Sequence, residues 1–430
     1  MIKIILLIGY LLIVGVRLGL DVINLRHRRK TGHQLPDLFA QRIDQERLQR
    51  SEEYALARDR IDLLETLLGT VLTLLFVFGG LLLWYDELIG TWSDRFIISG
   101  LLFFGVLILI QSLLGLPFSL YRHFVLEERF GFNRMTPKLW LTDQIKALLI
   151  GSLLFVLLAG GALWLVQVAP HSWWLWVWGF WAGLSVFLLL LSPYLIEPLF
   201  FTFKPLDKPE LEDRVRSLLG RAGVKAGKIL QVDASKRSGH SNAYFTGIGK
   251  VKRVVLFDTL LEQLNDEELL AVLAHELGHW RLGHLRQRLI KSQVVALLSC
   301  LVAFYLLGSQ VVPSWFGFEG LSFAAQVVLL GWLAAQLGFF WAPVSNWWSR
   351  HHERQADQFA IDLVGSGTSL ATGLVTLAKE NLSNLFPHPL FVAFYYSHPP
   401  MIERVAWLKQ QSARSTSQEA VSAGPESAGG

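Results

Sequence analysis

The chain has 430 residues, of which 52% are hydrophobic and 17% are charged, with a formal net charge of +4 at pH 7. This composition excludes intrinsic disorder, and the charged fraction lies well below the roughly 25% of an average soluble domain. Because Cys300 is the single cysteine, an internal disulfide framework and cysteine-based zinc or iron–sulfur sites are excluded. In so apolar a chain, the basic balance favours loops beside anionic lipid, and we expect no nucleic-acid partner.

Apolar runs long enough to cross about 30 Å of hydrocarbon, which takes about 20 helical residues, recur along the chain. They lie at about 2–23, 64–84, 97–120, 146–168, 172–193, 289–308 and 321–343. The first run lacks a small-residue cleavage site and carries Arg17 near its far end, so we interpret it as a retained helix rather than a signal peptide. The sequence predicts a mainly α-helical, multi-pass integral membrane protein with seven transmembrane helices.

Lysine and arginine are concentrated in alternate loops. Segment 24–61 is rich in arginine and includes Lys30, whereas 169–171 and 309–320 contain neither lysine nor arginine. The positive-inside rule therefore places the N-terminus outside and the C-terminus in the cytoplasm, together with the two largest polar segments, 194–288 and 344–430. The C-terminus carries no retention address, and we favour a bacterial inner membrane over the endoplasmic reticulum.

Segment 194–288 mixes helical and strand patterns and predicts a cytoplasmic α+β domain. Asn265 followed by Glu268 is typical of a helix start, which predicts a helix from about Asp266 to Leu282. A β-hairpin is expected where Ile248-Gly249-Lys250 joins two β-like runs. The other expected elements are a helix at Pro209–Leu219, a strand at Lys228–Val232, and the hairpin strands at Asn242–Gly247 and Val251–Phe257.

The helix expected over 266–282 carries the strongest chemical signal, the motif His-Glu-Leu-Gly-His at 275–279. Two histidines four positions apart share a helix face, so His275 and His279 can converge on one zinc ion. Zinc lowers the pKa of a bound water, and Glu276 beside the first histidine can accept the proton as general base. The motif therefore predicts one catalytic zinc ion per chain.

A catalytic zinc needs a third protein ligand. Leu282 and Leu285 stand where the metzincin pattern requires glycine and histidine, so that class is excluded. His284 is one place off that spacing, and on a continuous helix it turns away from the motif histidines.

A second polar helix, expected over 344–365 as a continuation of the seventh span, offers better candidates. Glu353 and Asp357 share one face of it. We predict that Glu353 is the third ligand and that Asp357 holds a ligand imidazole through its second N–H. His351 and His352 remain alternative ligands.

Several stretches of the chain are typical of one family. They are Ala274–Trp280, Glu353–Asp357, Ser235–Gly247, Tyr396–Pro400 and Glu127–Asn133. In these stretches, and in its seven spans, the chain resembles the CAAX prenyl protease 1 family of type I membrane zinc endopeptidases, up to about residue 410. The heat-shock membrane proteases share the His-Glu-x-x-His motif but have fewer spans.

The resemblance implies a chamber between seven tilted helices, closed at its cytoplasmic end by the zinc site, and cleavage of prenylated peptides before their last three residues. It implies that Asn242, Ala243 and Tyr244 form an edge strand that pairs with extended substrate. It also implies that His398 stabilises the tetrahedral intermediate and that Arg404 lies close to the site. The residues alone leave three plainer roles open: a turn for Asn242, a capping or surface position for His398 and a salt bridge for Arg404.

The resulting prediction is an integral membrane zinc metalloendopeptidase with a zincin-like catalytic domain. We expect a monomer that cleaves near the C-terminus of prenylated CAAX-type peptides, or cleaves membrane-associated proteins. The expected parts are membrane helices in 1–193, a catalytic region in 194–288, membrane helices in 289–343, a second catalytic segment in 344–410 and a disordered tail in 411–430.

Two alternatives remain. One is a protease that acts on membrane proteins generally or within the bilayer; for intrabilayer cleavage the motif helix is too polar. The other is a quality-control or peptide-binding protein with a structural zinc. Such a site needs no general base, so Glu276 would have no role in it.

Overall fold

The computed structural model describes the chain except for residues 33–34, 36, 247–250, 308 and 423–430. Seven helices of the described residues are long and apolar enough to cross a membrane, which confirms the predicted number. They are α1 (Ile2–Thr31), α3 with η1 (Gln45–Thr73 and Leu74–Phe78), α5 with η2 and α6 (Phe96–Tyr121, Arg122–Glu127 and Glu128–Phe130), α7 with η3 and α8 (Pro137–Phe155, Val156–Gly160 and Gly161–Val168), α9 with α10 (Trp173–Leu195 and Glu197–Phe200), α14 (His284–Leu307) and α16 (Phe323–Val364).

The second of these helices differs from its expected bounds of 64–84. It begins at Gln45, where the Asp44 side chain accepts the backbone N–H of Arg47. It ends at Phe78, because Gly80 takes a left-handed conformation with φ of 88°. The apolar run therefore continues into a separate short helix, α4 (Leu81–Trp92).

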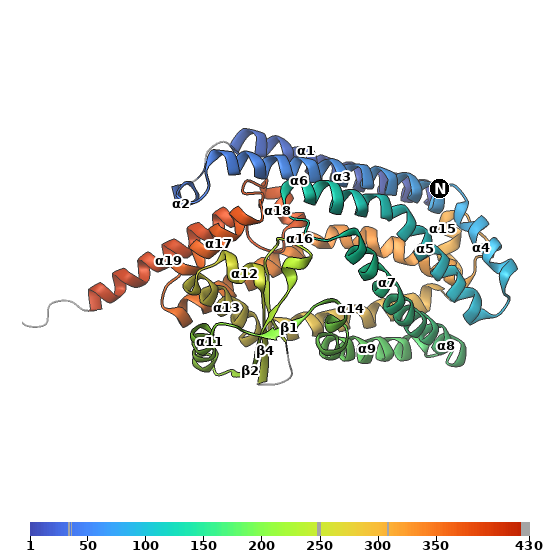
Figure 1. Ribbon diagram of the computed structural model, residues 1–430. Coiled ribbons are helices and arrows are strands. Elements are labelled where there is room, and N and C mark those ends of the chain that lie inside the picture. The colour runs from blue at the N-terminus through green and yellow to red at the C-terminus, as the bar shows by residue number, and fades with distance from the viewer. Residues whose placement is uncertain (33–34, 36, 247–250, 308, 423–430) are drawn as a thin grey trace, which may run out of the picture.

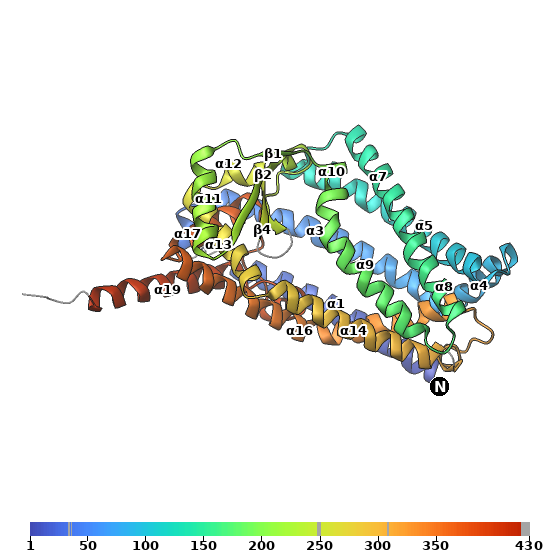
Figure 2. The ribbon, with the colours of Figure 1, turned by 90° about the horizontal axis from the view of Figure 1, so that it is seen from below.

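The N-terminus lies at the end of the membrane helices that is remote from the sheet, and α1 and α3 run side by side (Figures 1 and 2). An apolar cavity of about 1040 Å³ lies between the membrane helices. Its walls include Tyr10 of α1, Leu163 of α8, Val177 of α9, Cys300 of α14 and Leu330 of α16.

The polar segment 194–288 builds a four-stranded sheet in the order β1-β2-β4-β3, so β3 lies at an edge. β3 and β4 are antiparallel neighbours, as expected for the two arms of a hairpin, and their connection lies outside the described residues. The sheet is larger than the hairpin, because β2 pairs with β4 in parallel and a further strand, β1, joins β2. The strands are β1 (Phe203–Pro205), β2 (Lys225–Val232), β3 (Ala243–Thr246) and β4 (Val251–Phe257).

Helices from both polar segments share one apolar core with this sheet. Leu218, Val254, Leu273, Leu374 and Val405 are among its buried members. The helices of this region are α11 (Pro209–Arg221), η4 (Ala234–Lys236), α12 (Asp258–Gln263), α13 (Asp266–Arg281), α17 (Thr368–Glu380), α18 (Pro389–Tyr395) and α19 (Met401–Ser422). The short α2 (Asp37–Ala40) adds Phe39 to the same core, whereas α15 (Val311–Phe316) packs among the membrane helices.

Residues 411–422, where we expected the start of a disordered tail, are the last turns of α19. Leu408 is fully buried in the core. One turn later, the Ser412 hydroxyl accepts the backbone N–H of Gly367 at 2.8 Å. These tertiary contacts hold α19 as far as Ser412.

The stretch Glu127–Asn133 attaches the catalytic region to the membrane helices. Phe132 stacks on the His240 ring with centroids 4.3 Å apart, and Asn133 forms a β-bridge with Ser238. His240 Nε2 lies 3.4 Å from Glu127 Oε2, while the other carboxylate oxygen, Oε1, accepts the Tyr54 hydroxyl. The segment that leads into β3 is thereby held against the end of α5.

This contact predicts a pH-dependent contribution to stability. The hydrogen bond to Glu127 raises the pKa of His240. A histidine whose pKa is raised in the folded state stabilises the fold fully at pH values below its unfolded pKa of about 6.5. This stabilisation is lost as the pH rises through the pKa in the folded state. We therefore expect His240→Gln to lower the melting temperature in detergent more at about pH 5.5 than at about pH 9. Exposed His171→Gln serves as the control, and an equal loss at both pH values would contradict the prediction.

Candidate metal centre

The motif helix α13 begins and packs as its sequence requires. The Asn265 side chain accepts the Glu268 N–H at 3.0 Å and the Glu268 carboxylate accepts the Asn265 N–H at 3.3 Å, which completes a capping box. Further along, Gly278 faces Ala356 of α16, where a Cβ atom would meet the Ala356 Cα at 3.0 Å. The missing side chain allows α13 and α16 to approach closely, and this approach brings Glu353 beside the motif histidines.

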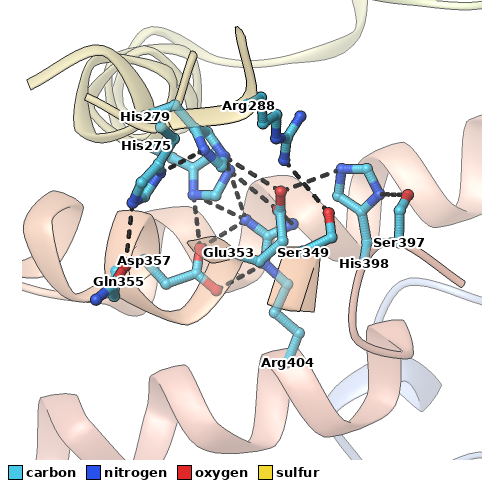
Figure 3. A network of polar contacts seen from close by, with 11 residues as sticks. His275, His279, Arg288, Ser349, Glu353, Gln355, Asp357, Ser397, His398 and Arg404 are labelled. Carbon is cyan, nitrogen blue, oxygen red and sulfur yellow. Dashed lines mark hydrogen bonds and ion pairs between the residues drawn. The ribbon is translucent and has the colours of Figure 1, made fainter. Parts of the chain in front are cut away.

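Three side chains converge between these helices (Figure 3). His275 Nε2 and His279 Nε2 are 3.2 Å apart, and they lie 3.4 and 3.2 Å from the two carboxylate oxygens of Glu353. A tetrahedral zinc with bonds of about 2.0–2.1 Å separates its ligand atoms by about 3.3 Å. Among the described residues, the buried Glu353 Oε2 has no hydrogen-bond partner. The residues therefore fit a zinc ion.

Asp357 and Arg404 support the first histidine from behind. Asp357 Oδ1 lies 2.8 Å from His275 Nδ1. Arg404 donates from Nε and Nη2 to the two Asp357 oxygens at 2.7 and 2.5 Å. Burial alone would lower the pKa of Arg404, but the carboxylates of Asp357 and Glu353 raise it, so the guanidinium stays charged. Both side chains are buried. Arg404 forms a salt bridge with Asp357, which is the plainer role that the sequence left open for it.

His398 reaches the site from the chain that follows α18. Its Nε2 lies 3.3 Å from Glu353 Oε1, and the Ser397 hydroxyl lies 3.0 Å from its Nδ1 (Figure 3). Desolvation by its neighbours lowers the pKa of His398, although 63% of its side chain is exposed, and the positive charge of Arg404 acts in the same direction, against the carboxylate of Glu353. A neutral imidazole at neutral pH can offer one N–H to a ligand.

Glu276 follows the first motif histidine and is half-buried. No hydrogen bond or ion pair of its carboxylate occurs within the described part of the chain, so the group is free to act as a base. Its carboxylate lies near enough to Arg404 to help raise the pKa of that guanidinium.

The segment Asn242-Ala243-Tyr244 enters β3, the edge strand that contacts α13. Asn242 is exposed, and its backbone oxygen accepts the Phe257 N–H at 3.1 Å. The Tyr244 hydroxyl donates to Glu197 at 2.6 Å. The free edge of β3 therefore presents backbone groups close to the metal-site helix.

Neither alternative histidine belongs to the converging group. His351 is exposed and stacks on Trp347. His352 is buried, but its Nε2 accepts the Trp348 indole N–H at 2.7 Å.

His284 lies beside the motif histidines, contrary to the prediction that it turns away on a continuous helix. Gly283 has φ of 72° and separates α13 from α14. The turn returns His284 to the site, where its Nδ1 lies 3.0 Å from His279 Nδ1. A glycine just beyond a polar helix is a common helix-end signal, and it could have revealed the break.

The chain matches two known protein families over nearly its full length. Residues 24–202 match "CAAX prenyl protease N-terminal, five membrane helices", and residues 205–412 match "Peptidase family M48". The chain is 34% identical over 384 residues to CAAX prenyl protease 1 homolog of Arabidopsis thaliana, covering 86% of this chain and 89% of the relative. It is 32% identical over 414 residues to CAAX prenyl protease 1 of Saccharomyces cerevisiae, covering 89% and 90%.

A solved structure has the same fold. The crystal structure of S. mikatae Ste24p superposes with a TM-score of 0.87 at 30% sequence identity, covering 95% of this chain and 99% of that chain. The likeness therefore extends through both the membrane helices and the polar segments that form the site.

Proposed function

The chain belongs to the CAAX prenyl protease 1 family of multi-pass membrane metalloproteases, and we propose that it cleaves peptide bonds near the C-terminus of prenylated substrates with one zinc ion. The observation that carries this proposal is the convergence of His275, His279 and Glu353 at the spacing of tetrahedral ligands. The three residues would hold the ion and leave a fourth position open.

The proposed mechanism assigns separate tasks to the surrounding residues. When bound, zinc lowers the pKa of water and polarises a peptide carbonyl. Glu276 accepts the proton of the attacking water and returns it to the leaving amine. His398 donates an N–H to the carbonyl oxygen as negative charge develops there. Because water is the nucleophile, no covalent bond between enzyme and substrate forms.

Asp357 and Arg404 act as positioning residues in this proposal. Asp357 accepts the Nδ1–H of His275 and so directs Nε2 toward the ion. The two hydrogen bonds from Arg404 fix the Asp357 carboxylate. Neither side chain needs to touch the substrate.

Two surfaces support the proposed substrate. An extended peptide can pair with the free edge of β3 along Asn242 to Tyr244, which holds the scissile bond beside α13. The apolar cavity between the membrane helices supports a lipid-bearing peptide and a chamber of the kind the resemblance implies. The distribution of basic loops supports a cytoplasmic active site. We propose that the protein acts as a monomer in a bacterial inner membrane.

A paired cleavage assay tests the substrate class. The zinc-loaded protein in detergent is given a farnesylated C-terminal peptide and its unprenylated twin. We expect about one zinc per chain and a kcat/KM at least about tenfold higher for the farnesylated peptide, because burial of the lipid adds binding energy. Equal rates would favour proteolysis of membrane proteins without prenyl specificity. No cleavage of either peptide would overturn the proposed substrate.

A further inference from the structure

Both motif histidines have a partner at the ring nitrogen that faces away from the converging group. His275 Nδ1 meets the Asp357 carboxylate at 2.8 Å. His279 Nδ1 meets His284 Nδ1 at 3.0 Å, and His284 Nε2 lies 3.0 Å from Gln355 Oε1. Resting on the zinc site proposed above, we propose that His284, supported by Gln355, positions His279 as a metal ligand.

The positions of the protons make this chain of contacts directional. A neutral imidazole that offers the lone pair of Nε2 to a metal carries its proton on Nδ1. His279 therefore donates, and His284 Nδ1 accepts. A neutral His284 with an accepting Nδ1 carries its own proton on Nε2, which donates to the Gln355 oxygen. Every contact then has one donor and one acceptor.

The surrounding residues hold the His284 ring in this orientation. His284 is buried, with 2% of its surface exposed, and it stacks on His352 with centroids 4.0 Å apart and ring planes 6° apart. His352 is fixed in turn by the indole N–H of Trp348. The turn at Gly283 sets where His284 begins α14.

These contacts give His284 a role distinct from that of a ligand. Its Nδ1 faces the Nδ1 of His279, on the opposite side of that ring from the converging Nε2 atoms. Partners of this kind orient ligand rings, and their loss commonly weakens metal binding about 10- to 100-fold. His279 therefore has a neutral partner, where His275 has a charged one.

Two substitutions of His284 separate hydrogen bonding from packing. His284→Asn retains an acceptor near the Nδ1 position but loses the ring, whereas His284→Phe retains a ring for stacking but loses the acceptor. Zinc affinity is measured by competition with a chelator in detergent, without substrate. We expect His284→Phe to lower the affinity about 10- to 100-fold and His284→Asn to lower it only a few-fold. The visible spectrum of the cobalt-substituted protein should change more in His284→Phe.

Gln355 provides a second test, because its exposed side chain makes misfolding of its variants less of a concern. Gln355→Leu should weaken zinc binding several-fold, and Gln355→Glu, which keeps an acceptor, should restore it. Exposed His351→Phe on the same helix is the matched control and should bind zinc as the unmodified protein does.

Two results would overturn the positioning role. One is the reverse order, in which Phe is tolerated and Asn is not, since that order identifies a packing role. The other is unchanged affinity in both variants of His284. Because no peptide is needed, failure to cleave prenylated substrate leaves this measurement intact. Absence of zinc binding by the unmodified protein would overturn both this inference and the proposed function.

Discussion

Replacing Glu276 with glutamine should abolish turnover while the protein keeps its metal. The substitution preserves the size and place of the side chain but removes the group that accepts the water proton. General bases contribute about 10²- to 10⁴-fold, so we expect kcat/KM to fall about 10³-fold. Zinc content should remain about one per chain, because His275, His279 and Glu353 are unchanged. Metal analysis and peptide cleavage on the same preparation provide the measurement.

The control for this experiment is Glu262→Gln, an exposed glutamate on α12 that precedes the motif helix. It should retain both zinc and activity. Full activity in zinc-loaded Glu276→Gln would contradict the role of Glu276 as general base. A structural metal would then be the better interpretation.

The same change of carboxylate to amide at Glu353 should have a different result. Glu353 is 1% exposed, and its two oxygens face the two motif histidines. The neutral amide is a poorer zinc ligand, because the site loses the only negative charge in its ligand set. We therefore expect Glu353→Gln to lose zinc during dialysis against a mild chelator and to lose at least about 10³-fold in activity together with it.

Zinc content after dialysis is the decisive readout for Glu353. Asp362→Asn, an exposed carboxylate nine positions further along α16, serves as the control and should keep the metal. If Glu353→Gln retains stoichiometric zinc under conditions in which the unmodified protein retains it, Glu353 is not the third ligand. The contrast between Glu276 and Glu353 then separates the base from the ligand within one site.

A structural-zinc protein and a protease differ most sharply at Glu276. A purely structural site uses its ligands and leaves no task for a carboxylate without hydrogen bonds or ion pairs within the described residues. The edge strand β3 beside α13 adds a place for extended peptide, which a structural clip would not need. These features favour catalysis, in agreement with the metallopeptidase family to which the chain belongs.

Much of the architecture could be predicted from local patterns. Long apolar runs predicted all seven membrane helices, because a helix that spans lipid must be apolar along about 20 consecutive residues. The capping residues Asn265 and Glu268 predicted where the motif helix begins, because they satisfy backbone groups within one turn. The histidine spacing predicted that His275 and His279 share a face.

Local patterns were weaker where a helix had to end or be held. Gly80 breaks an apolar run that resembles one span, and Gly283 returns His284 to the site. Residues 411–422 have the composition of a flexible tail, yet they continue α19 from the contacts that Leu408 and Ser412 make with distant residues. In each case, the result depends on a backbone conformation or a distant partner that a short window of sequence does not contain.

The amino-acid sequence by itself therefore determined the membrane class, the order of the spans and the chemistry of the motif. The sequence also offered Glu353 and Asp357 as partners of the motif histidines, and only the tertiary structure decided how these residues and His284 come together. Glu353 reaches the motif histidines because Gly278 allows α13 to lie against Ala356 of α16. His284 and Gln355 meet behind His279 because the turn at Gly283 brings the first residue of α14 back beside α16. Periodicity and capping act within a few turns of one helix. These contacts arise instead from the packing of helices that are far apart in the sequence, and no local pattern encodes that packing.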